Sequence, residues 1–173
     1  GCYLRDSVFL DEPSFLFSDF EVSNINGFNV TCHGGEDGFI DLTVNGSVPP
    51  YEYLWSNGEV ASAINNISAG LYSYVVTDQN GCQTSNNIVL TQPNLNISES
   101  VNHVSCFGGI DGSVSVTVSG TYEPHYIFWD NNINTSMLEG GLYTYVIIDS
   151  IGCVHNQSIV VNEPLPITVI EQI

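Results

Sequence analysis

Five cysteines are the most reactive side chains in this sequence. They are Cys2, Cys32, Cys82, Cys106 and Cys153, and no two of them form the C-x-x-C pair typical of zinc and redox sites. Disulfide bonds are therefore the chemistry that their spacing favours. Disulfides persist in oxidising compartments outside the cytoplasm. The cysteines thus predict an exported protein.

Four aspartates flank these cysteines in a regular way. Asp37 and Asp111 each lie in a Gly-Gly-x-Asp-Gly loop that follows a cysteine. Asp78 and Asp149 each lie four residues before a cysteine. Two carboxylates with loop carbonyls could begin a calcium site, because Ca²⁺ binds oxygen ligands. The commoner alternative is that each aspartate accepts hydrogen bonds from its own backbone in an Asx turn, which needs no ion.

The sequence repeats itself after about 75 residues. Residues 32–58 laid over 106–132 give 11 identities in 27 positions, and residues 70–93 laid over 141–164 give 11 in 24. The first 13 residues resemble the end of this unit. We therefore expect the tail of a preceding repeat at residues 1–13, one repeat at 14–93, a second repeat at 94–164, and a linker or the start of a following repeat at 165–173.

Within each repeat, hydrophobic residues alternate with polar ones at a period of two. Ile40, Leu42 and Val44 are an example, and such alternation is typical of half-buried strands. Turn pairs such as Asn57-Gly58 and Asn80-Gly81 separate the segments. In the first repeat we expect strands at 28–31, 40–44, 51–55, 62–67, 71–77 and 88–91. This pattern predicts an all-β protein made of tandem Ig-like β-sandwich repeats.

In such a sandwich, each repeat would hold one disulfide. Cys32 with Cys82 would close a loop of about 50 residues, worth about 4 kcal/mol in the chain-entropy model. Cys106 with Cys153 would do the same in the second repeat. These bonds would bring the two aspartates of each repeat together. Cys2 would then have its partner upstream of this sequence.

Composition and motifs exclude several classes of function. One Lys or Arg against 19 Asp and Glu gives a net charge of −18, so nucleic acid is not an expected partner. No apolar run approaches the ~18 residues of a membrane span, so we expect no direct membrane insertion. Nucleophile elbows, P-loops and H-E-x-x-H motifs are absent. None of the four histidines, His33, His103, His125 and His155, recurs in the other copy, so we expect no enzyme.

The recurring motifs resemble the SprB-type repeat. They are Cys32–Gly38, Pro49–Gly58, Ala69–Tyr72 and Asp78–Cys82, with counterparts in the second copy at Cys106–Gly112, Pro124, Trp129, Gly141–Tyr143 and Asp149 to Cys153. The resemblance implies a giant cell-surface adhesin of gliding Bacteroidota, exported by the type IX system. It also implies a filament, outer-membrane-attached or secreted, that acts in adhesion and gliding. The short linkers between repeats predict a semi-rigid rod in which neighbouring repeats are each other's partners.

Two functions fit such an adhesin. In the first, the repeats are a stalk that holds a binding tip away from the cell. In the second, they bind polysaccharide or an abiotic surface themselves, through exposed Tyr51 and Tyr53 and with calcium assisting. The stalk is favoured, because His125 and Ile127 replace these two tyrosines in the second copy.

Two serines are candidate O-glycosylation sites. Ser7 and Ser150 each follow an aspartate and precede an aliphatic residue, a pattern that resembles the glycosylation sites of exported proteins in this group of bacteria. Apart from glycans and calcium, no cofactor is expected.

Overall fold

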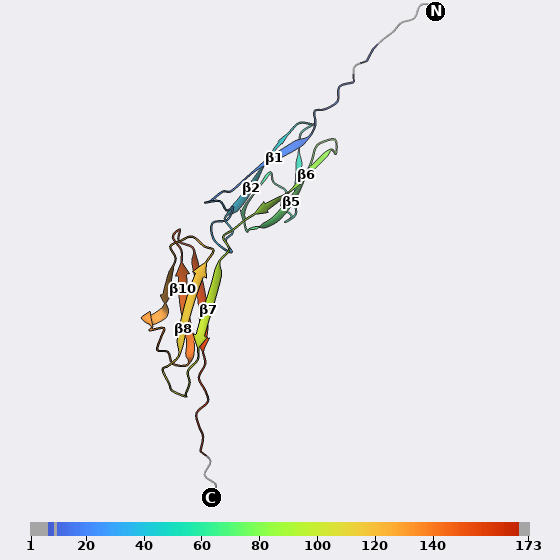
Figure 1. Cartoon of the computed structure of the whole chain (residues 1–173). Coiled ribbons are helices and arrows are strands. Elements are labelled where there is room, and N and C mark those ends of the chain that lie inside the picture. Colours follow the sequence, from blue (N-terminus) through green and yellow to red (C-terminus); the bar gives the residue numbers. More distant parts are fainter. Residues whose placement is uncertain (1–6, 9, 170–173) are drawn as a thin grey trace, which may run out of the picture. The chain divides into compact units, whose positions relative to one another are not determined.

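The computed structural model describes residues 7, 8 and 10–169, and it divides the chain into two compact β units (Figure 1). The first unit contains the described residues up to Gln92, except the segment Thr31–His33. The second unit contains this segment together with the chain from Pro93 onward. A short piece of the first sequence repeat therefore belongs to the second compact unit.

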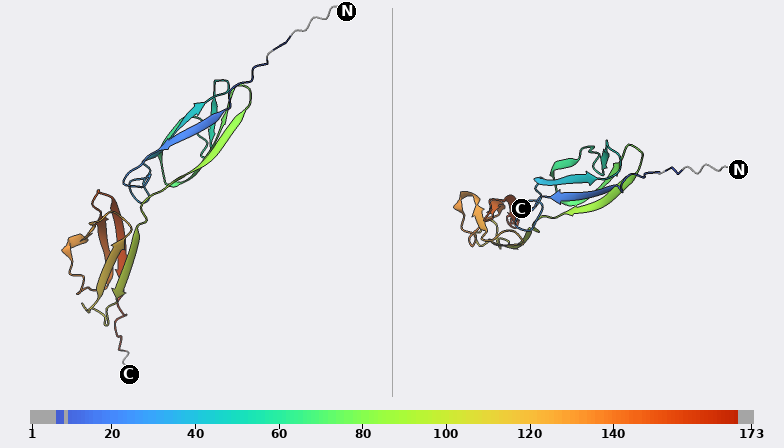
Figure 2. Two further views of the ribbon diagram at one scale, coloured as in Figure 1. Left: turned by 45° about the horizontal axis from the view of Figure 1, so that its top comes forward. Right: turned by 90° about the horizontal axis from the view of Figure 1, so that it is seen from above.

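The first unit consists of two three-stranded antiparallel sheets, with strand orders β1-β2-β4 and β3-β5-β6. Figure 2 shows this unit from two further directions. Its strands are β1 (Phe17–Val22), β2 (Gly38–Asn45), β3 (Glu52–Trp55), β4 (Ala63–Ile67), β5 (Gly70–Thr77) and β6 (Gln83–Leu90).

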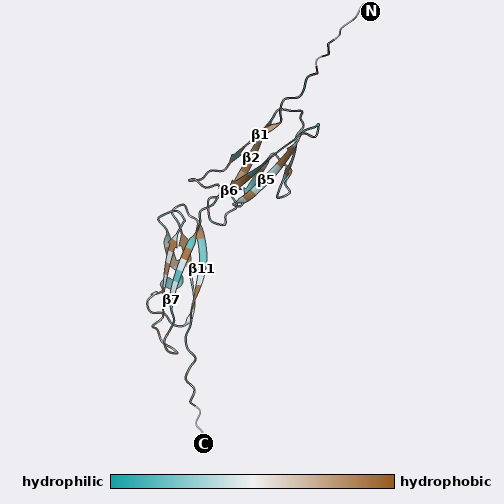
Figure 3. Cartoon of the chain, turned by 45° about the vertical axis from the view of Figure 1, so that its right-hand side comes forward, coloured by the Kyte–Doolittle hydropathy of each residue, from teal (hydrophilic) through white to brown (hydrophobic). Residues whose placement is uncertain are grey.

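Side chains from both sheets meet in one core. They are Ile40, Leu42, Trp55, Ile64, Tyr74, Val76, Ile88 and Leu90. Trp55 is 2% exposed and satisfies its indole N–H by donating to the Ala61 carbonyl at 2.8 Å. Because inward and outward residues alternate, hydrophobic and hydrophilic positions follow one another along several strands (Figure 3). The two sheets thus form a β-sandwich.

The second unit has a two-stranded sheet, β7-β8, and a three-stranded sheet in the order β11-β10-β9. The strands are β7 (Asn96–Asn102), β8 (Ser113–Ser119), β9 (Tyr126–Trp129), β10 (Gly141–Ile148) and β11 (Val154–Val161), with a 3-10 turn at Asp130–Asn132. Its core contains Val104, Val114, Leu138, Ile159 and Val161, with Trp129 packed against it. The strand pairs in both units are antiparallel, which confirms the expected all-β sandwich class.

The second unit has no strand equivalent to β4 among the residues that the structure describes. An isolated bridge between Gly112 and Leu138 stands in its place. This is the region where the second copy is three residues shorter. No helix in the described part of the chain is long and apolar enough to cross a membrane.

One expected strand is wrong. Residues 28–31 are not a strand, although the Val30 side chain is fully buried and its N–H donates to the Thr91 carbonyl at 3.0 Å. The edge strand is instead β1, which lies earlier in the chain. The first copy has six more residues between Pro13 and Cys32 than the second has between Pro93 and Cys106. This longer segment contains a turn at Asn26-Gly27, where φ is 50° and 91°. The hydrophobic pattern identified the buried valine but not the backbone that carries it.

Candidate functional site

Two recurring segments carry the cysteines and aspartates. We call Asp78–Cys82 and Asp149–Cys153 the Asp turns, and Cys32–Gly38 and Cys106–Gly112 the Cys loops. The Asp turns connect β5 to β6 and β10 to β11. Each Cys loop precedes the second strand of its repeat, β2 or β8.

In the first Asp turn, the aspartate accepts hydrogen bonds from its own turn. Asp78 Oδ1 accepts from the backbone N–H groups of Asn80 at 2.9 Å and Cys82 at 2.7 Å. Its other oxygen, Oδ2, accepts from the Ser47 hydroxyl. Gly81 adopts φ +85°, a left-handed conformation that favours glycine. This confirms the Asx-turn alternative for Asp78.

The second Asp turn repeats this geometry. Asp149 Oδ1 accepts from the N–H groups of Ile151 at 3.2 Å and Cys153 at 2.9 Å, and Oδ2 accepts from the Thr121 hydroxyl. Burial alone would raise the pKa of Asp149, but these hydrogen bonds lower it overall. The pKa of Asp78 is also lowered, chiefly by the Ser47 hydrogen bond. Both aspartates are thus held as carboxylates that stabilise their turns.

Each Cys loop is anchored to the residue two positions beyond the last strand of its own repeat, β6 or β11. The N–H of Gly34 donates to Gln92 Oε1 at 2.8 Å, and the N–H of Gly108 donates to Glu163 Oε2 at 3.1 Å. Within the second loop, the N–H of Gly109 donates to the Cys106 carbonyl at 3.0 Å. The N–H of Ser105 donates to Asp111 Oδ1 at 3.0 Å. The pKa of Asp111 is lowered, chiefly by its hydrogen bond with the Ser105 hydroxyl and also by this N–H. Hydrogen bonds from loop N–H groups to these two side chains therefore fix both loops beside the segments that follow β6 and β11.

The disulfide pairing expected within each repeat is wrong. Cys32 is bonded to Cys153, with Cα atoms 5.6 Å apart and a sequence separation of 121 residues. Cys82 and Cys106 are free and exposed. Cys2 lies outside the described residues. The bond therefore joins the first cysteine of one sequence repeat to the second cysteine of the next.

The segment around this bond is part of the second unit. The Cys153 sulfur lies 3.8 Å from the Thr31 carbonyl, and His33 Nδ1 lies 3.1 Å from the Pro93 carbonyl. The His33 and His155 rings are 6.3 Å apart between centroids. Burial, followed by the neighbouring His33, lowers the pKa of His155. The neutral form of the His155 imidazole is thus favoured in this environment.

The structure does not bring the candidate calcium ligands together. Asp37 directly precedes β2, whereas Ser47, the partner of Asp78, lies just beyond its other end. A strand of 8 residues spans about 27 Å, so the two carboxylates of a repeat cannot share an ion. Asp111 and Asp149 are related in the same way across β8. Among the described residues, no group of three or more His, Cys, Asp or Glu side chains could hold a metal ion.

The candidate ligand-binding tyrosines are half-buried rather than exposed. Tyr51 and Tyr53 pack against the core of the first unit, and the Tyr51 hydroxyl donates to the Gly46 carbonyl at 2.6 Å. Partial burial raises the pKa of Tyr53, with Tyr51 and Asp41 adding to the rise. Trp55 is a core residue two positions after Tyr53, and side chains two apart on a strand share a face. The sequence therefore predicts that Tyr53 faces the core.

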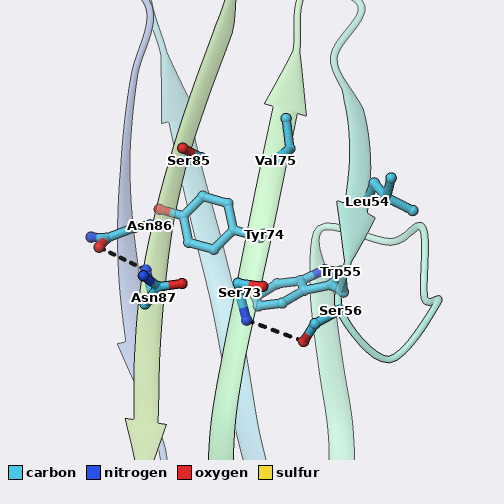
Figure 4. A pocket seen from close by; sticks show the side chains of 9 residues that line it. All are labelled: Leu54, Trp55, Ser56, Ser73, Tyr74, Val75, Ser85, Asn86 and Asn87. Carbon is cyan, nitrogen blue, oxygen red and sulfur yellow. Dashed lines mark hydrogen bonds between the residues drawn. The ribbon is translucent and has the colours of Figure 1, made fainter.

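A shallow cavity of about 480 Å³ lies on the sheet β3-β5-β6 (Figure 4). Its lining residues are Leu54, Trp55, Ser56, Ser73, Tyr74, Val75, Ser85, Asn86 and Asn87. They include no carboxylate, imidazole or amine. The Tyr74 hydroxyl is hydrogen-bonded to the Ser18 hydroxyl at 2.8 Å, and the Ser56 hydroxyl oxygen accepts from the Ser73 N–H at 3.2 Å. The cavity therefore offers hydroxyl and amide groups.

Sequence analysis missed an exposed aromatic pair in the second unit. Tyr126 and Phe128 on β9 are each 55% exposed, with ring centroids 6.4 Å apart. Their first-repeat counterparts are Glu52 and Leu54. The signal was available, since residues that alternate with the core-facing Trp129 must point outward. The pair is an apolar surface specific to the second repeat.

The candidate glycosylation serines lie on the surface. Ser7 and Ser150 are both exposed. Ser150 directly follows the buried Asp149 in the second Asp turn, and its N–H donates to the Tyr122 carbonyl at 3.3 Å. The structure leaves both hydroxyls accessible for modification, which stays a prediction.

The fold and its recurring turns define a tandem β-sandwich repeat protein. The family model of the SprB repeat matches the chain at residues 28–60 and again at 98–132. One match falls in each copy of the sequence repeat, which confirms the resemblance to the SprB repeat that the motifs predicted. A comparison with curated proteins found no match. SprB repeats occur in cell-surface proteins, which supports an adhesin-type repeat region and indicates an extracellular location.

Proposed function

We propose that this chain is a non-enzymatic stalk segment of a cell-surface adhesin that acts in adhesion and gliding. In this role, successive repeats hold a binding region away from the cell and transmit tension to it. The parent protein would be exported by the type IX system and either attached to the outer membrane or assembled as a secreted filament.

The bond between Cys32 and Cys153 is the observation that carries the proposal. Tension on a stalk runs along the chain, and this bond closes a loop of 121 residues against extension. A disulfide confined to one repeat would protect only that repeat. A bond from one repeat to the next prevents tension from extending most of the chain in both repeats.

The roles of the residues shared by both repeats also support a stalk. Asp78 and Asp149 accept hydrogen bonds within their turns, and Trp55 and Trp129 pack in or against the cores. Three recurrent glycine pairs adopt positive φ angles: Gly34 and Gly108, Gly46 and Gly120, and Gly81 and Gly152. A binding repeat would be expected to direct its shared residues toward a common surface. Here they maintain the fold instead.

Binding of the 173-residue chain to a polysaccharide panel and to glass tests this proposal, with and without calcium. An unrelated β-sandwich of matched net charge is the control. A stalk gives no saturable binding above the control under either condition. Saturable binding above the control would contradict the proposal.

A second candidate function is adhesion by the repeats themselves, and the exposed pair Tyr126 and Phe128 is the observation that favours it. Exposed aromatic rings can stack on sugar rings or lie on apolar surfaces. The double variant Tyr126→Glu with Phe128→Leu copies the first repeat and is its matched test. It would abolish binding if this face were the adhesive surface, whereas Tyr51→Phe would leave binding intact.

A further inference from the structure

The observed disulfide follows a rule that can be applied to the two free cysteines. The rule pairs the Cys-loop cysteine of one repeat with the Asp-turn cysteine of the next, as in Cys32 with Cys153. Cys106 is the Cys-loop cysteine of the second repeat, and Cys82 is the Asp-turn cysteine of the first. Both are exposed thiols at positions whose counterparts in this same chain are bonded.

The surroundings of Cys82 form a cavity at the first Asp turn. Its volume is about 300 Å³. The lining residues are Glu12, Pro13, Ser14, Phe15, Leu16, Ser47, Cys82 and Gln83. At the corresponding turn of the second unit, the segment Thr31–His33 lies beside Cys153, which is only 3% exposed. The first turn thus has an open cavity where the second holds the Cys loop of another repeat.

Cys106 lies in a loop that is already shaped for such a contact. The hydrogen bonds from Gly109 to the Cys106 carbonyl and from Gly108 to Glu163 fix the loop within its own repeat. The next residue, Phe107, is 58% exposed. An apolar side chain in that position matches the apolar wall that Pro13, Phe15 and Leu16 give the cavity at Cys82.

We infer that Cys82 and Cys106 are the two complementary halves of a disulfide joint between copies of this repeat. Cys106 of one copy enters the cavity at Cys82 of another, with Phe107 covered by the apolar wall. In a longer tandem array, every repeat would then be bonded to the one before it and to the one after it. This inference deepens the proposed stalk role and rests on it for its biological meaning.

The chemistry of the joint is thiol–disulfide exchange with a disulfide-class oxidant. The two thiols lose two electrons and two protons as their S–S bond forms. An oxidant disulfide such as oxidised glutathione accepts them, its S–S bond breaks, and it leaves as two thiols. The reaction suits the oxidising locations in which structural disulfides persist.

The test mixes two single-thiol versions of the full chain in a glutathione redox buffer. Both carry Cys2→Ser, one also carries Cys82→Ser, and the other also carries Cys106→Ser. Mass spectrometry then counts the mixed dimer joined through Cys106 and Cys82 against the two like dimers. Random collisions make the mixed dimer equal to the two like dimers together. We expect it to exceed them by about tenfold.

A variant of the cavity separates recognition from simple thiol reactivity. Phe15→Ser removes an 84% exposed cavity residue and should reduce the excess of the mixed dimer toward the random ratio. Phe17→Ser, a nearby exposed position outside the cavity lining, is the matched control and should leave the excess unchanged.

Two results would overturn the inference. One is a random ratio of mixed to like dimers with Phe15 unmutated, and the other is that no dimer has formed once thiol–disulfide exchange with glutathione has reached equilibrium. The polysaccharide and glass experiment does not depend on these two cysteines. A failure of the joint and a failure of the stalk role are therefore distinguishable.

Discussion

The two Asp turns share the same backbone hydrogen bonds, but their cysteines differ in exposure and in bonding. In both, the aspartate Oδ1 accepts the N–H of the cysteine four residues later, at 2.7 Å for Cys82 and 2.9 Å for Cys153. Yet Cys82 is a free exposed thiol, whereas Cys153 is buried and bonded to Cys32. The turn is therefore a property of each repeat, and the disulfide is a property of the order in which repeats follow one another.

Of the predicted changes, removal of a bonded cysteine should have the largest effect on the free energy of unfolding. Cys32→Ser should lower the free energy of unfolding of the chain by about 5 kcal/mol, because the 121-residue loop is no longer closed in the unfolded chain. Denaturant unfolding under oxidising conditions measures the change. Cys82→Ser is the matched control and should leave the stability of this chain unchanged. An equal loss of stability in both variants would contradict the difference between the bonded and the free cysteine.

A tight glycine in the second unit, Gly120, should give the next largest effect on stability. Gly120 has φ +82°, and a Cβ there would lie 1.9 Å from the Asn94 carbonyl oxygen. Gly120→Ala should therefore cost about 3 kcal/mol of unfolding free energy, measured by thermal or denaturant unfolding. Gly58→Ala is the control, since Gly58 has φ +90° but open space around it, and should cost about 1 kcal/mol. Equal costs would show that the close carbonyl does not matter.

The Asp turns should respond alike to acid. Their carboxylates have lowered pKa values in the folded state, so their stabilisation is present above the ordinary aspartate pKa and is lost as the pH falls below it. Asp149→Asn should cost about 1–2 kcal/mol near neutral pH and reduce the acid sensitivity of the second unit. Chemical denaturation from pH 6 down to pH 3 measures both. An unchanged pH dependence in the variant would contradict this role.

His155 should give the smallest effect, and only in the second unit. Its pKa is lowered in the folded state, so the unfolded chain takes up the proton first and stability falls as the pH drops below about 6.5. The loss should be a few tenths of a kcal/mol between about pH 7 and pH 5. His155→Thr copies Thr84 of the first repeat and should remove this slope in thermal melts. A slope that persists in the variant would assign it to another group.

Much of the fold could be predicted from the sequence because it depends on local patterns. Alternating hydrophobic residues marked β2 and most of the other strands, and the aspartate before each Gly-Cys pair indicated a turn. The edge strand β1 was missed, since its FSDFEV sequence has no clear alternation. The half-buried positions of Tyr51 and Tyr53 follow from the same alternation, because they lie four and two residues before the core residue Trp55 on one strand face.

The cysteine pairing could not be predicted from spacing alone. The entropy of closing a loop changes slowly with its length, by about 0.6 kcal/mol for each doubling. A 50-residue loop from Cys32 to Cys82 and a 121-residue loop from Cys32 to Cys153 therefore differ little in this respect. Only the three-dimensional positions distinguish them, because the Cys loop and the Asp turn of one repeat lie beyond opposite ends of the same strand, β2.

Stretching single molecules by their two ends tests the central claim most directly, that a disulfide between successive repeats locks the stalk. Under oxidising conditions only the residues outside Cys32 to Cys153 should extend. A reductant should then release one further length of about 40 nm, corresponding to 121 residues. Full extension without reductant, or two separate releases of about 17 nm as expected for a bond within each repeat, would contradict the account.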